Sequence, residues 1–183
     1  LCSIIAALRD ADGRVTVPGF YDRVRELSAD ERRALNAVPF HEAGFIAESG
    51  SPGPFGEKGY TTLERVSVRP TLDVNGMWSG YIGEGGKTVL PSFAAAKVSM
   101  RLVPDQDGPE VFRTFEAHVR RLAPVGVTVK VIDMHTAPPF LTSPDHPMLE
   151  AARRALKRAW TKPPVMIREG GSIPVMATFK ETH

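Results

Sequence analysis

The sequence predicts an α+β fold, and three observations lead to this prediction. Three strand-like runs lie within residues 1–133, and one of them alternates strictly between apolar and polar side chains. Two stretches with apolar residues at helical spacing lie before and between these runs. With 183 residues, of which 42% are hydrophobic and 24% charged, the chain has the composition of a globular protein and room for one domain and part of a second.

A helix is the first element expected, because Leu1, Ile4, Ile5 and Leu8 fall on one helical face. This pattern starts at the first residue, without a capping residue and without an initiator methionine. At the other end, the run ATFKETH (177–183) completes no element. We therefore expect the sequence to be an internal piece of a longer protein.

Residues 11–60 form a long irregular stretch, which we interpret as an insertion. Ser28 precedes the run ADERRAL and is expected to cap a short helix there. Further along, the run SPGPFG (51–56) has the glycines and prolines of a turn-rich connector.

Three strand-like runs follow, over residues 63–69 with an extension to 74, 95–103 and 127–132. The middle run places its apolar residues on one face and its polar residues, Arg101 among them, on the other. Before the third run, Asp107 introduces a helix with an apolar face. The resulting order is that of a ferredoxin-like two-layer sandwich without its first strand, with two helices on one face of an antiparallel sheet.

A change of composition after residue 133 indicates a domain boundary, since the run TAPPFLTSPDHP (136–147) is rich in proline. A helix ending near Trp160, a short strand over residues 165–167 and a turn over residues 168–174 are expected beyond it. We assign residues 1–133 to a first domain and 134–183 to a partial α/β segment of a neighbouring domain, because the second part has too little apolar surface to fold alone.

Composition excludes several classes of partner. The net charge is only +2 and the basic residues are scattered, so no nucleic acid is expected. No apolar run approaches the ~20 residues of a membrane-spanning helix, so no membrane is expected either. Cys2 is the only cysteine, which rules out an internal disulfide and favours a cytoplasmic location. The five histidines lack any spacing typical of metal ligands, so no metal site is expected within the chain.

The run GYIGEGGKT (80–88) has some features of a phosphate-binding loop, but its spacing does not fit. Tyr81 stands where that pattern requires glycine, and Val89, Leu90 and Pro91 follow where a helix should begin. We predict a glycine-rich hairpin loop instead.

Three other places have side chains suited to an anionic ligand. Arg101 could bind a carboxylate bidentately from its strand, and His135 lies at the domain boundary, where clefts form. Gly171 and Ser172 lie in a turn whose amides and hydroxyl suit a carboxylate or an oxyanion. Each has a structural alternative, namely a solvated arginine, a structural histidine and a tight turn.

Taken together, DGRVTVPGFYD (12–22), GYIGEGGKTVLPSFAAAKVSMRLVPDQD (80–107) and REGGSIP (168–174) resemble the carnosinase-like branch of the zinc metallopeptidases. That family also includes carboxypeptidase G and the succinyl-diaminopimelate desuccinylases. The resemblance implies a lid that interrupts a catalytic domain with two zinc ions, a homodimer formed through the lid, and a small peptide substrate whose C-terminal carboxylate is free.

Roles for individual residues also follow from the resemblance. It implies that Arg101 holds the carboxylate of the substrate, that Thr88 contributes to the active site of the partner subunit, and that His135, Gly171 and Ser172 bind substrate on the catalytic side. The zinc ligands, the general base and the lid histidine of the family have no match here. We therefore expect no catalytic residue in this sequence, and neither peptide hydrolysis nor tight zinc binding by the chain alone.

Two alternatives stay open at this stage. The chain could be a non-enzymatic ferredoxin-like module for dimerisation or small-ligand binding, or it could belong to a pseudoenzyme that kept the fold and lost the metal. Flanking sequence with or without the zinc ligands would distinguish both alternatives from the hydrolase.

Overall fold

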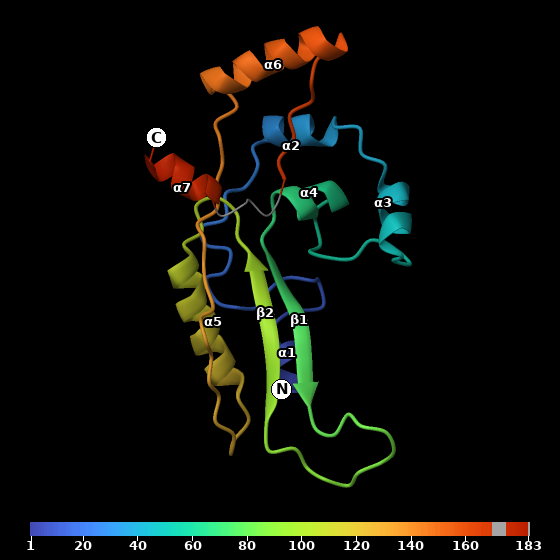
Figure 1. Ribbon diagram of the computed structural model, residues 1–183, viewed down its shortest axis with the longest axis vertical. Helices are drawn as coiled ribbons and strands as arrows, with labels where there is room; N and C mark the ends of the chain where they lie inside the picture. The colour runs from blue at the N-terminus through green and yellow to red at the C-terminus, as the bar shows by residue number, and fades with distance from the viewer. Residues whose placement is uncertain (170–174, 183) are drawn as a thin grey trace.

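The computed structural model describes residues 1–169 and 175–182, and it confirms the α+β fold. Figure 1 shows a molecule that is longer than it is wide, with an antiparallel pair of strands along its long axis. The loop that joins the strands lies at one end, and most of the short helices gather around the other (Figure 1).

Strands β1 (Thr71–Ser79) and β2 (Ala94–Arg101) form the sheet, with Thr71 opposite Arg101 at one end and Ser79 opposite Ala94 at the other. The alternation predicted for β2 is confirmed, because its polar residues are exposed while its apolar residues pack on the core. The register shifts between Val74 and Gly76, where β1 has one unmatched residue.

One face of the sheet is covered by α1 (Cys2–Ala6) and α5 (Gly108–Leu122). Asp107 caps α5 as predicted, since its carboxylate accepts a hydrogen bond of 2.8 Å from the amide of Glu110. The two helices and the sheet enclose a core of nine buried apolar side chains: Ile4, Leu8, Val15, Val17, Phe20, Leu72, Val111, Phe115 and Val119. Two helices on one face were expected, and the core confirms this arrangement.

The stretch expected to be an insertion holds α2 (Ala29–Asn36) and α3 (Glu42–Ser49), and the connector over residues 51–56 has no regular structure. Ser28 caps α2 as predicted. Its hydroxyl accepts from the amide of Glu31 at 3.2 Å, and Glu31 accepts in return from the Ser28 amide at 3.0 Å.

The strand expected over residues 63–69 with an extension to 74 is wrong in its first part, which forms helix α4 (Thr62–Ser67), whereas residues 71–74 of the extension begin β1. Its apolar run was short enough to fit either element. Thr61 and Glu64 decide in favour of a helix, because each side chain accepts a hydrogen bond from the amide of the other, at 3.2 and 2.7 Å. Glu64 is also buried, with its Oε1 3.0 Å from Nε of Arg32 in an ion pair that lacks hydrogen-bond geometry.

Residues 127–132 and 165–167 are not strands either, in contrast to the prediction. Val129 and Val131 still pack on the core, and the guanidinium of Arg120 donates to the Val129 carbonyl at 2.8 Å. A strand requires a neighbour to share its hydrogen bonds. In a ferredoxin-like sheet that neighbour is the first strand, and no strand precedes α1 in the described residues, so the segment stays extended but unpaired.

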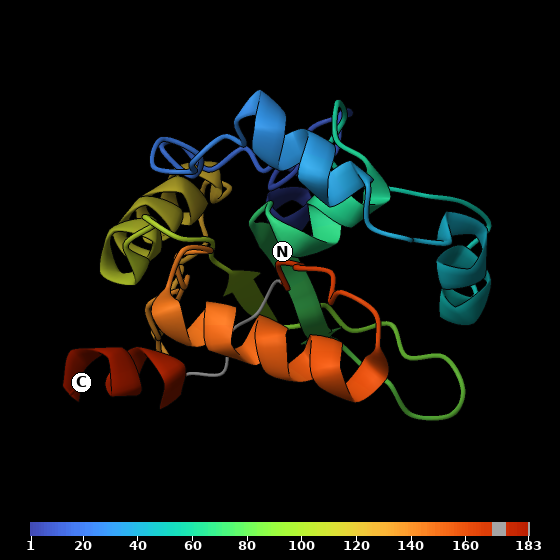
Figure 2. The ribbon, with the colours of Figure 1, turned by 90° about the horizontal axis from the view of Figure 1, so that it is seen from above.

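Helices α6 (Pro147–Trp160) and α7 (Val175–Thr182) form the C-terminal part. His146 caps α6, with its Nδ1 accepting from the Met148 amide at 3.2 Å. Figure 1 shows α6 at the end of the molecule opposite the β1–β2 loop, and the view from above places it on the other side of the molecule from α2 (Figure 2). No residue of α6 is buried. Across the described residues, no helix is both long and apolar enough to cross a bilayer.

A buried ion pair joins the insertion to the start of β1. Arg69 binds Glu57 bidentately, with Nε and Nη2 at 2.9 and 2.8 Å from its two oxygens, and also binds Glu26 at 3.0 Å. The guanidinium lies over the rings of Tyr21 and Tyr60, 5.1 and 4.1 Å from their centroids. Burial alone would lower the pKa of Arg69, but its hydrogen bonds to Glu57 and the nearby carboxylates raise it, so the group remains charged.

A buried histidine joins α5 to the end of α1. Arg121 lies 3.0 Å from Nδ1 of His118, and Oγ1 of Thr16 lies 3.3 Å from its Nε2. The Thr16 hydroxyl in turn donates to the carbonyl of Ala7. Because Arg121 can only donate, Nδ1 must accept and the proton must sit on Nε2, so the neutral ring satisfies every partner. Burial, and then the charge of Arg121, lowers the pKa of His118.

Breaking the buried ion pair is expected to destabilise the fold strongly. Arg69→Gln leaves the charge of Glu57 buried without its main partner, which costs about 3–5 kcal/mol of unfolding free energy. Urea unfolding followed by circular dichroism measures the loss. Arg153→Gln removes an exposed pair with Glu150 and should change little. Equal stability of the two variants would show that the pair of Arg69 and Glu57 does not stabilise the fold.

The lowered pKa of His118 makes stability depend on pH in a defined direction. Below about pH 6.5 the unfolded histidine takes up a proton that the folded one still refuses, so the free energy of unfolding falls as the pH falls through this range. Urea midpoints between about pH 8 and pH 5 should show the slope, and His118→Gln should reduce it. An unchanged slope in the variant would assign the effect to another group.

Candidate functional site

Arg101 ends β2 at the edge of the sheet where β1 begins, opposite Thr71. Side chains alternate along a strand, so Arg101 points away from the face on which Met100 packs. The guanidinium is exposed, and it makes no hydrogen bond or ion pair with any residue in 1–169 or 175–182. All five of its donors are therefore open to a ligand.

A cleft of about 580 Å³ lies beside Arg101, which places it within the usual size range of small-molecule sites. Apolar walls come from Phe55, Val66, Pro70, Leu102 and Val103. Its charged lining consists of Arg9, Glu57, Arg65, Arg69, Asp73 and Arg101. The site thus combines apolar contact surface with several guanidinium groups.

Most of these charges are already paired. Arg9 lies 3.3 Å from Asp73 and donates to the carbonyl of Leu72 at 2.6 Å, and the pair of Arg69 and Glu57 closes another wall. Tyr21 also lines the cleft. Burial raises the pKa of its phenol, although the hydrogen bond that the Val15 amide donates to the phenol oxygen acts in the opposite direction.

Arg65 was missed in the sequence, because residues 63–69 were expected to form a strand. In the structure it projects from α4, and its Nε donates to the carbonyl of Glu57 at 2.9 Å. The signal that could have found it is the Thr61-x-x-Glu64 pattern, which is typical of a helix start and would have placed Arg65 on a helix.

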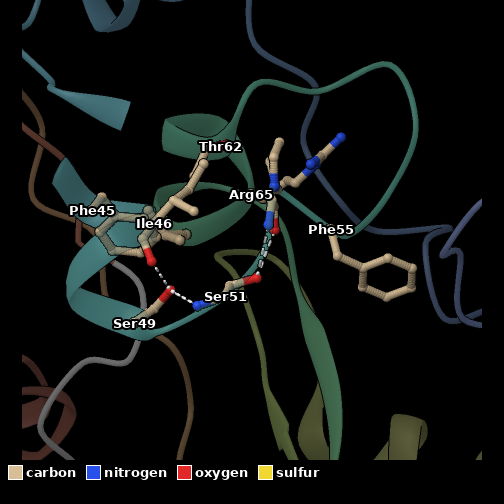
Figure 3. Close-up of a pocket in the computed structure, with 10 residues that line it drawn as sticks. Phe45, Ile46, Ser49, Ser51, Phe55, Thr62 and Arg65 are labelled. Atoms are coloured by element: carbon tan, nitrogen blue, oxygen red, sulfur yellow. Dashed lines mark hydrogen bonds between the residues drawn. The ribbon is translucent and has the colours of Figure 1, made fainter. Parts of the chain in front are cut away.

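A smaller hollow of about 200 Å³ lies next to this cleft. Figure 3 shows Phe45 and Ile46 of α3 on one side of it and Phe55 on the other. Phe55, Arg65 and Val66 line both hollows. Phe55 is 81% exposed, so its ring is buried in neither hollow.

Thr88 lies in the loop at the other end of the hairpin from Arg101. An eight-residue strand spans about 25 Å, so the two side chains of one chain are too far apart to touch the same small ligand. The Val89 amide donates to the Lys87 carbonyl at 3.0 Å, which makes a tight turn around Thr88 and leaves this residue exposed. No helix follows the loop before β2, which agrees with the rejection of a phosphate loop.

His135 lies in the extended connection between α5 and α6, and its side chain is exposed. The structure does not bring it into the cleft beside Arg101. Gly171 and Ser172 fall outside the described residues, so their predicted roles remain predictions. In the described part of the chain, no three histidine, cysteine or acidic side chains gather closely enough to hold a metal ion.

Comparison with known proteins shows one matching family and several similar relatives. Residues 1–127 match the M20 peptidase dimerisation domain. The Cys-Gly metallodipeptidase dug1 of Schizosaccharomyces pombe is 29% identical over 185 residues, covering 100% of this chain and 39% of that protein. The human Beta-Ala-His dipeptidase is 26% identical over 191 residues, covering 99% of this chain and 36% of that protein.

A solved structure shows the same fold. The M20 family metallo-carboxypeptidase Sso-CP2 from Sulfolobus solfataricus aligns with a TM-score of 0.83 and 30% identity, over 99% of this chain and 41% of that one. The chain therefore spans about two fifths of the length of the relatives that it matches.

Arg101 should contribute little to stability, because it has no partner within the described residues. We expect Arg101→Gln to change the free energy of unfolding by less than about 0.5 kcal/mol. Arg9→Gln makes the same chemical change at a residue that holds the Leu72 carbonyl and Asp73, and should cost about 1–3 kcal/mol. Urea unfolding distinguishes the two, and a comparable loss at Arg101 would show that this residue has a structural role.

Proposed function

Because this chain belongs to the M20 peptidase dimerisation domain family, we propose that it is the lid and dimerisation part of a zinc-dependent metallopeptidase. The whole protein would hydrolyse dipeptides or related amide bonds that have a free C-terminal carboxylate. The observation that supports this most strongly is the TM-score of 0.83 with a metallo-carboxypeptidase over nearly the entire chain. The names of the two relatives, Cys-Gly and Beta-Ala-His dipeptidase, support a small peptide as the substrate.

The boundary between lid and catalytic segment is proposed at residues 133 and 134. The family match ends at residue 127, close to this point. Helix α6, which lies beyond it, buries none of its residues, and Trp160 at its end is 69% exposed. A helix with such exposed apolar side chains is expected to be covered by further protein, here the remainder of the catalytic domain.

A homodimer through the lid is supported by the far end of the hairpin. Large apolar side chains gather there on the surface: Met77, Trp78, Tyr81, Ile82, Val89, Leu90 and Phe93. Ile82 and Leu90 are 90% and 94% exposed, which is typical of an interaction surface rather than of a free loop tip. Such a contact would place Thr88 at the active site of the partner subunit. This would account for its distance from Arg101 of its own chain.

Two zinc ions are proposed for the whole protein, held by residues outside this sequence, as the family resemblance implies. When bound, zinc would polarise the scissile carbonyl and activate water. Within this chain, Arg101 would hold the substrate carboxylate through paired hydrogen bonds. Thr88, His135, Gly171 and Ser172 would add contacts that orient the peptide. We propose a cytoplasmic location, in line with the lone Cys2.

Complementation between subunits tests the proposed site. In the whole protein, Thr88→Val and Arg101→Gln should each reduce kcat/KM for a dipeptide by about 10–100-fold, the loss expected for a charge-assisted contact. If Thr88 acts across the dimer, co-expressed heterodimers of the two variants regain one intact site in two. Purification through two different tags isolates these heterodimers, and their activity should approach half that of the unaltered dimer.

Heterodimers as inactive as the parent variants would mean that both residues serve the same subunit, which contradicts the proposed arrangement. A monomer in sedimentation experiments on the whole protein would contradict the dimer itself. A whole protein that dimerises but hydrolyses no peptide in the presence of zinc would favour the non-enzymatic module or the pseudoenzyme.

A further inference from the structure

The charges that line the cleft beside β2 do not balance. Arg9 is neutralised by Asp73 at 3.3 Å, and Arg69 by Glu57 at 2.8 Å. These four groups cancel in pairs and hold one another in place. Subtracting them leaves two guanidinium groups in the lining, one on α4 and one at the end of β2.

These two groups are Arg65 and Arg101. Within residues 1–169 and 175–182, neither has a carboxylate at ion-pair distance. Arg65 uses only its Nε, which donates to the backbone carbonyl of Glu57, so its two Nη groups keep their donors free. Two like charges beside one cleft repel each other, and an anion between them removes that cost. The cleft lining therefore offers two guanidinium groups without a carboxylate partner to a negatively charged ligand.

The remaining walls indicate what joins the two negative groups. Phe55 and Val66 border the cleft near Arg65, while Leu102 and Val103 follow Arg101 along the chain. Phe55 and Val66 are both exposed, so a ligand that covers them removes apolar surface from water. A short chain of methylene groups between two carboxylates would match this combination of apolar and basic surface.

We propose that this cleft binds a small dicarboxylate, with one carboxylate on Arg101 and the other on Arg65. For the whole protein this names a substrate class, peptides whose C-terminal residue is aspartate or glutamate, and that extension rests on the proposed function. Arg101 would take the main-chain carboxylate, and Arg65 would select the acidic side chain. Arg65 is thus the specificity-determining residue.

Calorimetry on this chain tests the binding step directly. Glutarate and butyrate have the same kind of aliphatic chain but differ in charge, so glutarate should bind at least about tenfold more tightly. Arg65→Gln should reduce glutarate affinity to that of butyrate and leave butyrate binding unchanged. Arg101→Gln should weaken both ligands. Arg113→Gln on the exposed side of α5 is the matched control and should change neither affinity.

Absence of glutarate binding, equal affinity for the two acids, or the same loss in Arg113→Gln would overturn the proposal. Kinetics of the whole protein separate this failure from failure of the proposed function. Ala-Glu and Ala-Gln have nearly the same shape and differ in the charge of the C-terminal side chain. The unaltered protein should prefer Ala-Glu, and in Arg65→Gln the ratio of kcat/KM for Ala-Glu to that for Ala-Gln should fall about tenfold or more, towards one. If the unaltered whole protein hydrolyses Ala-Glu and Ala-Gln at equal rates, the proposed selectivity for an acidic C-terminal residue is wrong. The proposed hydrolase function would still stand.

Discussion

The buried pair of Arg69 and Glu57 is the interaction on which the rest of the structure depends. It joins the end of the insertion to the residues immediately before β1, and the rings of Tyr21 and Tyr60 cover it. Burying two charges is costly unless they remain together, so the insertion cannot move away from the sheet without exposing or separating them. The pair therefore fixes the position of α4 and one wall of the cleft.

The hairpin that starts from this fixed point has two ends of different character. Its anchored end carries Arg101 beside the cleft, and its far end carries exposed apolar side chains and Thr88. The same pair of strands can therefore contact a ligand at one end and a protein partner at the other. In a symmetric dimer, such a hairpin would link the active site of one subunit to the position of the other.

Local patterns in the sequence were sufficient for much of the fold. The alternation along β2 and the capping roles of Ser28 and Asp107 depend on neighbouring residues, and the structure confirms them. Features that depend on distant residues were not predictable in this way. Residues 127–132 need a strand that the described chain does not supply, and Arg65 lies at the cleft because its segment forms α4 instead of a strand. Arg101 was predicted as a candidate because a guanidinium on a polar strand face can bind a carboxylate, and its role as a ligand for substrate stays a prediction.

A ladder of only two strands has a further consequence for how the described part of the chain behaves in solution. Each strand satisfies its neighbour on one side and presents backbone amides and carbonyls on the other. An added extended segment can pair with these groups through main-chain hydrogen bonds, which do not depend on the identity of its side chains. Association through such an open border would be governed by main-chain geometry, so proline, which lacks an amide hydrogen, would block it more effectively than a change of surface charge.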